Sequence, residues 1–213
     1  TAGNDSGQLN SFSGTITGSL TKVGNNSLRL SGANIFEGNT DIKNGSLVVS
    51  NIAKKISATG CGTLTIHNQG ILTGAGYIEN KKVIIASGGI LRPGMNYLNS
   101  LRIKSDIEQQ QGGIIEWQLN GNNSVSAIRE VGRLTLKGTL RIHLKKGYSP
   151  QLGDSFQLWE CKEVSAVDDL ILELPELHNG LTWDTSGLFE PQGILRITDA
   201  TGKVVTGPAT VNP

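Results

Sequence analysis

The chain has 213 residues, of which 17% are charged and 5% aromatic, and its formal net charge is +1 at pH 7. Its basic residues never gather beyond a pair, whereas nucleic-acid binders need a basic face, so we expect no nucleic-acid partner. No apolar stretch reaches the roughly 18–20 residues that span a bilayer, so we expect no membrane-spanning segment. The length supports a single domain with a sizeable core.

Glycine opens a series of short apolar runs along the chain. Seven runs of the type Gly-x-Leu or Gly-x-Ile begin at Gly45, Gly62, Gly70, Gly89, Gly113, Gly138 and Gly193. In the first half, the spacing from Gly45 to Gly62 and from Gly70 to Gly89 is about 17–19 residues, a period typical of a stacked solenoid.

Apolar and polar residues alternate inside these runs, which predicts half-buried strands. In chain order the clearest examples lie at 28–30, 64–66, 101–103, 134–136, 140–144 and 195–197. The segments between them are rich in Asn and Gly, which tolerate the left-handed backbone of sharp corners. We expect aligned buried stacks that include Leu28, Leu30, Leu47, Val49, Leu64, Ile66, Ile85, Leu101 and Ile103.

The spacing predicts an all-β solenoid, a parallel β-helix, over residues 1–198 as one domain. Regular coils are expected over about 9–103, and longer coils that widen into a C-terminal cap over about 104–198. Residues 199–213 lose the alternation, gain Gly and Pro, and are interpreted as a linker or tail. An antiparallel β-sandwich is the alternative fold.

One stretch resembles a known repeat. Leu28-Arg29-Leu30-Ser31-Gly32-Ala33-Asn34 continues to Thr40 and is followed by Asn44-Gly45-Ser46-Leu47, a succession similar to the autotransporter-associated β-strand repeat. Gly88–Gly94 resembles the step that often follows such repeats, and 132–156 and 181–188 resemble the closing segment of those proteins. The resemblance implies a right-handed parallel β-helix in a secreted or cell-surface bacterial protein, with adjacent domains of a longer polypeptide as partners. Only one clean copy of the repeat is present.

The two cysteines are expected to be free thiols. Cys61 and Cys161 are separated by about five coils of a solenoid, which places them about 24 Å apart at the strand spacing of a sheet. A disulfide requires Cα atoms within about 7 Å.

Three carboxylates are candidates for catalysis, because β-helical enzymes that cleave polysaccharides carry acidic groups on an outward sheet face. These are Asp106, Glu108 and Glu116, and Glu116 is expected to point outward if Ile115 and Trp117 point inward. The sequence does not show the close carboxylate pair that glycoside hydrolysis needs. We therefore interpret them as solvated surface charges.

Binding candidates are few. Trp159 is out of phase with Phe156 and Leu158, which favours either an exposed ring that stacks on a sugar or a packing role in the cap. Trp117 and Trp183 are in phase with apolar neighbours and are assigned to the core. Asp168 and Asp169 form a pair of loop carboxylates that could bind a hard cation, but calcium requires six to eight oxygen ligands.

The three histidines show no metal-ligand spacing, and no phosphate-binding or nucleophile-elbow motif occurs, so no metal or cofactor is expected. The sequence predicts a non-catalytic structural or presentation module of a larger secreted or cell-surface bacterial protein. The alternatives are a carbohydrate-binding or adhesive module that uses Trp159, Asp168, Asp169 or Glu116, with polysaccharide as partner, and then a polysaccharide lyase or hydrolase.

Overall fold

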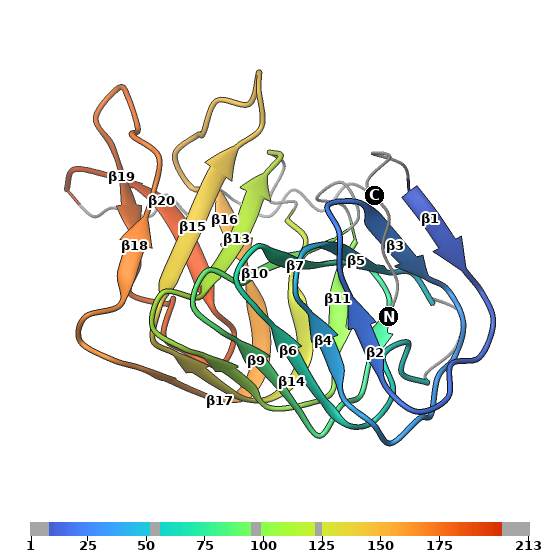
Figure 1. Cartoon of the computed structure of the whole chain (residues 1–213). Coiled ribbons are helices and arrows are strands. Elements are labelled where there is room, and N and C mark those ends of the chain that lie inside the picture. Colours follow the sequence, from blue (N-terminus) through green and yellow to red (C-terminus); the bar gives the residue numbers. More distant parts are fainter. Residues whose placement is uncertain (1–8, 52–55, 95–98, 122–124, 202–213) are drawn as a thin grey trace, which may run out of the picture.

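A computed structural model describes residues 9–51, 56–94, 99–121 and 125–201, and this part of the chain is built from β-strands without a helix (Figure 1). The first strands are β1 (Leu9–Phe12), β2 (Leu20–Lys22), β3 (Ser27–Leu30), β4 (Thr40–Ile42), β5 (Gly45–Val49), β6 (Thr63–Ile66), β7 (Gly70–Gly74), β8 (Tyr77–Ile78), β9 (Lys82–Ile85) and β10 (Ile90–Pro93). The remaining strands are β11 (Leu101–Ile103), β12 (Ile107–Gln109), β13 (Ile114–Leu119), β14 (Ile128–Leu136), β15 (Thr139–Leu144), β16 (Ser155–Gln157), β17 (Trp159–Ala166), β18 (Ile171–Glu173), β19 (Leu181–Asp184) and β20 (Ile194–Asp199).

Two parallel sheets face each other, and the chain passes between them in every coil. One sheet has the order β1-β3-β5-β7-β10-β13-β15-β18, and the other has the order β2-β4-β6-β9-β12-β14-β11-β8, with β17 also paired to β14. Every ladder in these two sheets is parallel, as in the pairing of Leu28 with Leu47 and of Leu47 with Leu72. This arrangement is a parallel β-helix, and it rules out the antiparallel sandwich.

The second sheet bends where its longest strand, β14, passes two neighbours. Ile128 at the start of β14 pairs with β11, whereas Leu134 near its end pairs with β12. Between these positions the register shifts, and Glu130 adopts a left-handed φ of 64°. Such a bulge turns a strand sharply, and the part of this sheet that contains β11 and β8 pairs with β14 ahead of the bend. Gly132 follows the bend because a Cβ there would lie 2.4 Å from the Asp106 Oδ1 atom.

The aligned core matches the predicted stacks except at one position. Eight of the nine predicted residues have no exposed surface: Leu30, Leu47, Val49, Leu64, Ile66, Ile85, Leu101 and Ile103. Leu28 is only partly buried, whereas Leu30, two residues further along the same strand, is completely buried. In-register parallel pairing repeats each inward position from coil to coil, so alternation along one strand becomes a continuous apolar column.

A small antiparallel sheet closes the C-terminal end, as expected for a widened cap. Its order is β16-β20-β19, and Leu195 and Ile197 of the central strand, β20, are buried. Trp183 in β19 is only half-buried, so its assignment to the core was wrong in degree. Its indole N–H donates to the Pro175 carbonyl at 2.8 Å, which holds the ring against the cap. β20 extends to Asp199, one residue into the predicted tail, and residues 202–213 lie outside the described part.

Buried asparagines join consecutive coils at their corners. The Asn34 side chain accepts from the Ile16 amide at 2.7 Å and donates to the Ala58 carbonyl at 2.8 Å. Asn51 accepts from the Tyr77 amide at 2.8 Å in the same manner. None of these residues has a positive φ, so these asparagines are present for their side-chain amides and not for left-handed corners. Each amide satisfies backbone groups that a strand ladder does not reach.

Candidate functional site

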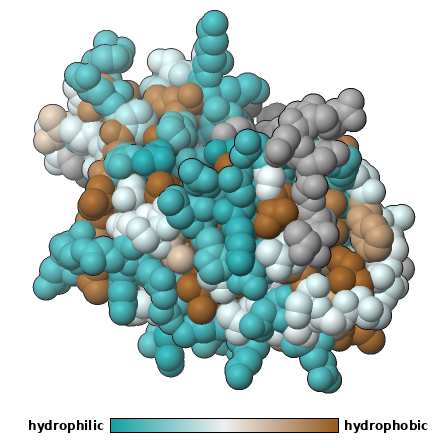
Figure 2. All heavy atoms as spheres, viewed as in Figure 1, coloured by the Kyte–Doolittle hydropathy of each residue, from teal (hydrophilic) through white to brown (hydrophobic). Residues whose placement is uncertain are grey.

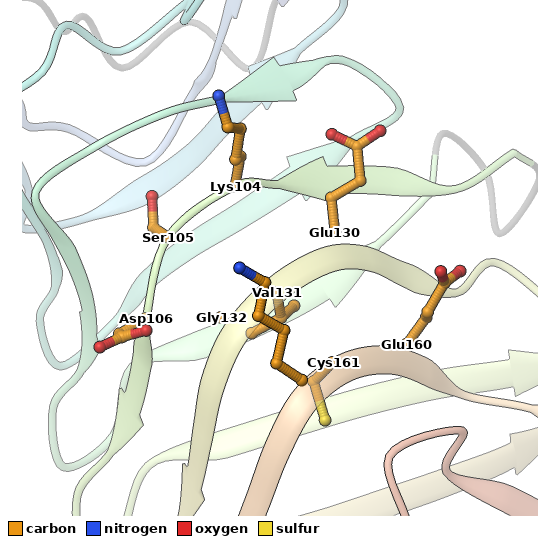
Figure 3. Close-up of a pocket in the computed structure, with 9 residues that line it drawn as sticks. Lys104, Ser105, Asp106, Glu130, Val131, Gly132, Glu160 and Cys161 are labelled. Carbon is orange, nitrogen blue, oxygen red and sulfur yellow. The ribbon is translucent and has the colours of Figure 1, made fainter.

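One hollow lies outside the bend of β14, between β11 and β17 (Figure 3). Its volume is about 510 Å³, and it is lined by Lys104, Ser105, Asp106, Glu130, Val131, Gly132, Glu160, Cys161 and Lys162. The bulge creates this hollow by turning the strand away from its neighbours. The lining is polar and mixed in charge.

Most charges around this hollow are paired across coils. Lys104 Nζ lies 2.8 Å from a carboxylate oxygen of Glu79, and this hydrogen bond lowers the pKa of Glu79 and raises that of Lys104. The carboxylate of Asp106, a predicted catalytic candidate, accepts a hydrogen bond from the Arg133 amide at 2.8 Å. Asp106 therefore holds the bend in place.

The other acidic groups of the hollow also form ion pairs with arginines of neighbouring coils. Glu130 lies 3.8 Å from Arg102, and Glu160 lies 3.2 Å from Arg129. The thiol of Cys161 is buried, and burial raises its pKa, so it is a poor nucleophile at neutral pH. The hollow thus holds a network of structural ion pairs beside an unreactive thiol.

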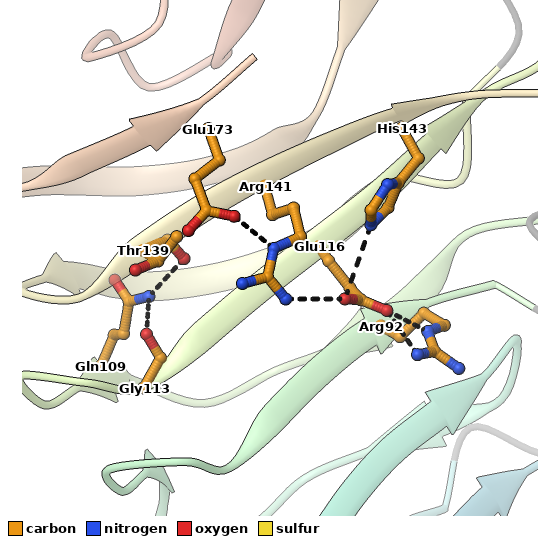
Figure 4. Close-up of polar contacts among 8 residues, drawn as sticks. All are labelled: Arg92, Gln109, Gly113, Glu116, Thr139, Arg141, His143 and Glu173. Carbon is orange, nitrogen blue, oxygen red and sulfur yellow. Dashed lines mark hydrogen bonds and ion pairs between the residues drawn. The ribbon is translucent and has the colours of Figure 1, made fainter. Parts of the chain in front are cut away.

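A second cluster lies on the outer face of the other sheet, around Glu116 in β13 (Figure 4). Its carboxylate forms an ion pair with Arg92 of β10 and lies 3.7 Å from Arg141 of β15. The Nε2 atom of His143 lies 3.9 Å away. Glu116 points outward, as predicted, but only 4% of its surface is exposed, so the expectation of a solvated charge was wrong. Long arginine side chains from both neighbouring coils cover it.

The ion pairs extend this cluster by one further coil. Arg141 donates from Nε to Glu173 of β18, which lowers the pKa of Glu173 and raises that of Arg141. The residues Arg92, Glu116, Arg141 and Glu173 therefore form a row of alternating charge across four adjacent strands, which we call the ion row. Opposite charges in directly facing positions stabilise a sheet, whereas like charges would destabilise it.

Glu108, the third catalytic candidate, lies in the other sheet. Its carboxylate forms an ion pair with Lys82 of the preceding coil, and the hydrogen bond from that ammonium group lowers the pKa of Glu108. Glu108 and Glu116 belong to different sheets, so the fold does not bring them together as an acid–base pair.

Trp159 is buried and has no exposed surface, so it offers no ring face to a sugar. Its ring packs on Trp117, with centroids 6.0 Å apart, and its N–H donates to the Glu190 carbonyl at 3.2 Å. The apparent phase error has a simple cause. Phe156 belongs to β16 in the cap sheet, and Trp159 begins β17 in another sheet, so the alternation restarts between them.

Asp168 and Asp169 are exposed in the turn after β17. In the described ranges no group of three or more His, Cys, Asp or Glu side chains is placed to hold a metal ion. Cys61 and Cys161 are both unpaired, as predicted, and Cys61 is exposed. Among the described residues, no helix has the length and apolar character needed to cross a membrane.

The sequence interpretation missed a hollow beside Tyr148, in the connection between β15 and β16. The available signal was Lys145-Lys146-Gly147-Tyr148, in which two cations and an aromatic residue share a turn.

No protein-family model matches this chain, and no curated protein sequence is similar to it.

Proposed function

We propose that this chain is a non-catalytic structural module of a larger secreted or cell-surface bacterial protein. In this role a stack of β-coils presents the adjacent domains of the same polypeptide. The ion row carries this proposal. Its carboxylates form ion pairs with arginines of the neighbouring coils. Glu108 forms an ion pair with an adjacent coil in the same way, and Asp106 accepts a hydrogen bond from one. Charges used in this way stabilise the stack and are poorly suited to acid–base work.

The geometry of the stack fits a spacer. β1 and the cap sheet lie at opposite ends of the molecule (Figure 1). The eight strands of the first sheet, at about 4.8 Å per strand, span about 34 Å. Partners attached at the two ends would be held apart by a continuous sheet. The similarity of residues 28–49 to the autotransporter-associated repeat also favours a secreted or surface location.

Energy transfer between dyes at the two ends tests this role. The variant carries Ser11→Cys in β1 and Ser186→Cys in the cap, with Cys61→Ser so that dyes attach only at the ends. We expect one narrow transfer peak that stays fixed as urea is added and disappears only when the circular dichroism of the sheet is lost. Broad or drifting transfer below that transition would contradict a rigid spacer.

A second measurement addresses the enzymatic alternative. The purified chain is incubated with neutral and acidic polysaccharides, with and without calcium, and new reducing ends and unsaturated products are counted. We expect no release above a heat-unfolded control. Cleavage that Glu108→Gln or Asp106→Asn abolishes in folded protein would overturn the proposal.

A further inference from the structure

The hollow beside Tyr148 has the features of a binding site. Its volume is about 410 Å³, and its side chains come from Asn120, Lys145, Lys146, Tyr148, Gln151 and Asp154. It lies beyond the ends of β13 and β15, and Figure 2 shows hydrophilic side chains gathered over this part of the molecule. A smaller hollow of about 240 Å³, which also includes His178, shares Tyr148 with it. The two hollows therefore adjoin at Tyr148 and Ser149.

Tyr148 is held rigidly between its neighbours. Its hydroxyl donates to the Asp154 carboxylate, and the Gln151 amide donates to the same oxygen at 2.9 Å. The ring meets Phe156 edge-on at 6.4 Å. Gly121 packs so closely on the ring that a Cβ there would lie 2.8 Å from it. A ligand would meet an ordered aromatic wall without the cost of ordering a loop side chain.

The charge of this hollow favours an anion. The carboxylate of Asp154 is already engaged by two hydrogen bonds, whereas Lys145 and Lys146 are exposed and enter no ion pair with another described residue. His143 precedes Lys145 by two positions and is exposed, whereas Arg141 is already engaged by Glu116 and Glu173 in the ion row. The two adjacent lysines match a chain with repeated negative charge.

We propose that the hollow beside Tyr148 binds an acidic polysaccharide, independently of the structural role. Uronate carboxylates pair with Lys145 and Lys146, and sugar hydroxyls exchange hydrogen bonds with the Ser149 hydroxyl and donate to the side-chain oxygen of Gln151. An aromatic wall beside amides and hydroxyls suits a sugar ring better than a bare phosphate, which needs only cations and backbone N–H groups.

Binding to immobilised intact chain tests the proposal, with oligogalacturonate, alginate and hyaluronan fragments as probes. We expect at least one of these to bind, and raising salt from about 50 to 500 mM should weaken its binding, because exposed charges are screened. The double variant Lys145→Gln/Lys146→Gln should bind about tenfold more weakly, with an unchanged thermal unfolding midpoint. The matched variant Lys43→Gln/Lys81→Gln removes the same charge from exposed sites in other turns and should bind within about twofold of the parent chain.

Three results would overturn the proposal. One is the absence of binding to all three probes. Another is equal weakening by both double variants, which would mean that net charge alone attracts the polymer. The last is equal or tighter binding of polyglutamate or polyphosphate, which would exclude recognition of the sugar.

Discussion

The indole ring of Trp159 packs on that of Trp117 across the core, with centroids 6.0 Å apart and planes inclined by 41°. Trp117 belongs to β13 in one parallel sheet, and Trp159 belongs to β17 beside β14 in the other. The pair fills the wider interior that the bend of β14 opens, and both rings are almost completely buried.

Replacing Trp159 by Ala should lower the free energy of unfolding by about 3–5 kcal/mol, because it removes a fully buried ring and leaves a cavity against Trp117. Urea unfolding followed by circular dichroism measures this loss. Trp183→Ala is the comparison, since that ring is half-buried, and should cost about 1–2 kcal/mol. Equal losses for the two variants would mean that Trp159 is not a core residue.

Replacing Glu116 by Gln should destabilise the chain by about 2 kcal/mol, because Arg92 and Arg141 lose the buried carboxylate between them. Glu163→Gln is the matched control. Glu163 also pairs with an arginine, Arg133, but both side chains are more than half exposed, so its loss should stay within about 0.5 kcal/mol. A negligible effect of Glu116→Gln in the same urea experiment would show that the ion row adds nothing to stability.

Stability should fall in acid. Three carboxylates have pKa values below the ordinary 4.5 because a cation donates a hydrogen bond to each. Lys104 donates to Glu79, Lys82 donates to Glu108, and Arg141 donates to Glu173. The unfolded chain then takes up protons at a higher pH than the folded chain does. The stabilisation is fully present above about pH 4.5 and is lost as the pH falls through the folded values.

The unfolding midpoint measured from pH 7 to pH 3 checks this slope. Glu108→Gln removes one of the groups that titrate, so the decline below about pH 4.5 should be shallower in that variant. A decline as steep as that of the parent chain would exclude Glu108 from the titration.

The two thiols should differ in reactivity. Cys61 is exposed and should react quickly with a thiol reagent in the folded chain, whereas Cys161 is buried and its pKa is raised. We expect one fast thiol in native protein and two in denaturant without reductant. Fast reaction of both in the native state would contradict the burial of Cys161, and Cys61→Ser identifies which thiol responds.

Local sequence was sufficient for the coil stack. Leu64 and Ile66 alternate with threonines, and alternation of period two allows only one face of a strand to be buried. The same rule failed at Trp159, because the chain changes sheets between Gln157 and Trp159 and the alternation restarts there. The same rule also overestimated the burial of Trp183, which lies in the small cap sheet and is packed against less of the protein.

The sequence by itself determined which side chains point inward and that the strands repeat in short coils, since both follow from the spacing of apolar residues and glycines. Only the tertiary structure decided which outward charges meet. Arg92 and Glu116 are 24 residues apart and Arg141 and Glu173 are 32 apart, so their pairing depends on the length of each coil and on the register between strands. Coil length and register depend on how whole coils stack, so they cannot be predicted from any short segment of the chain.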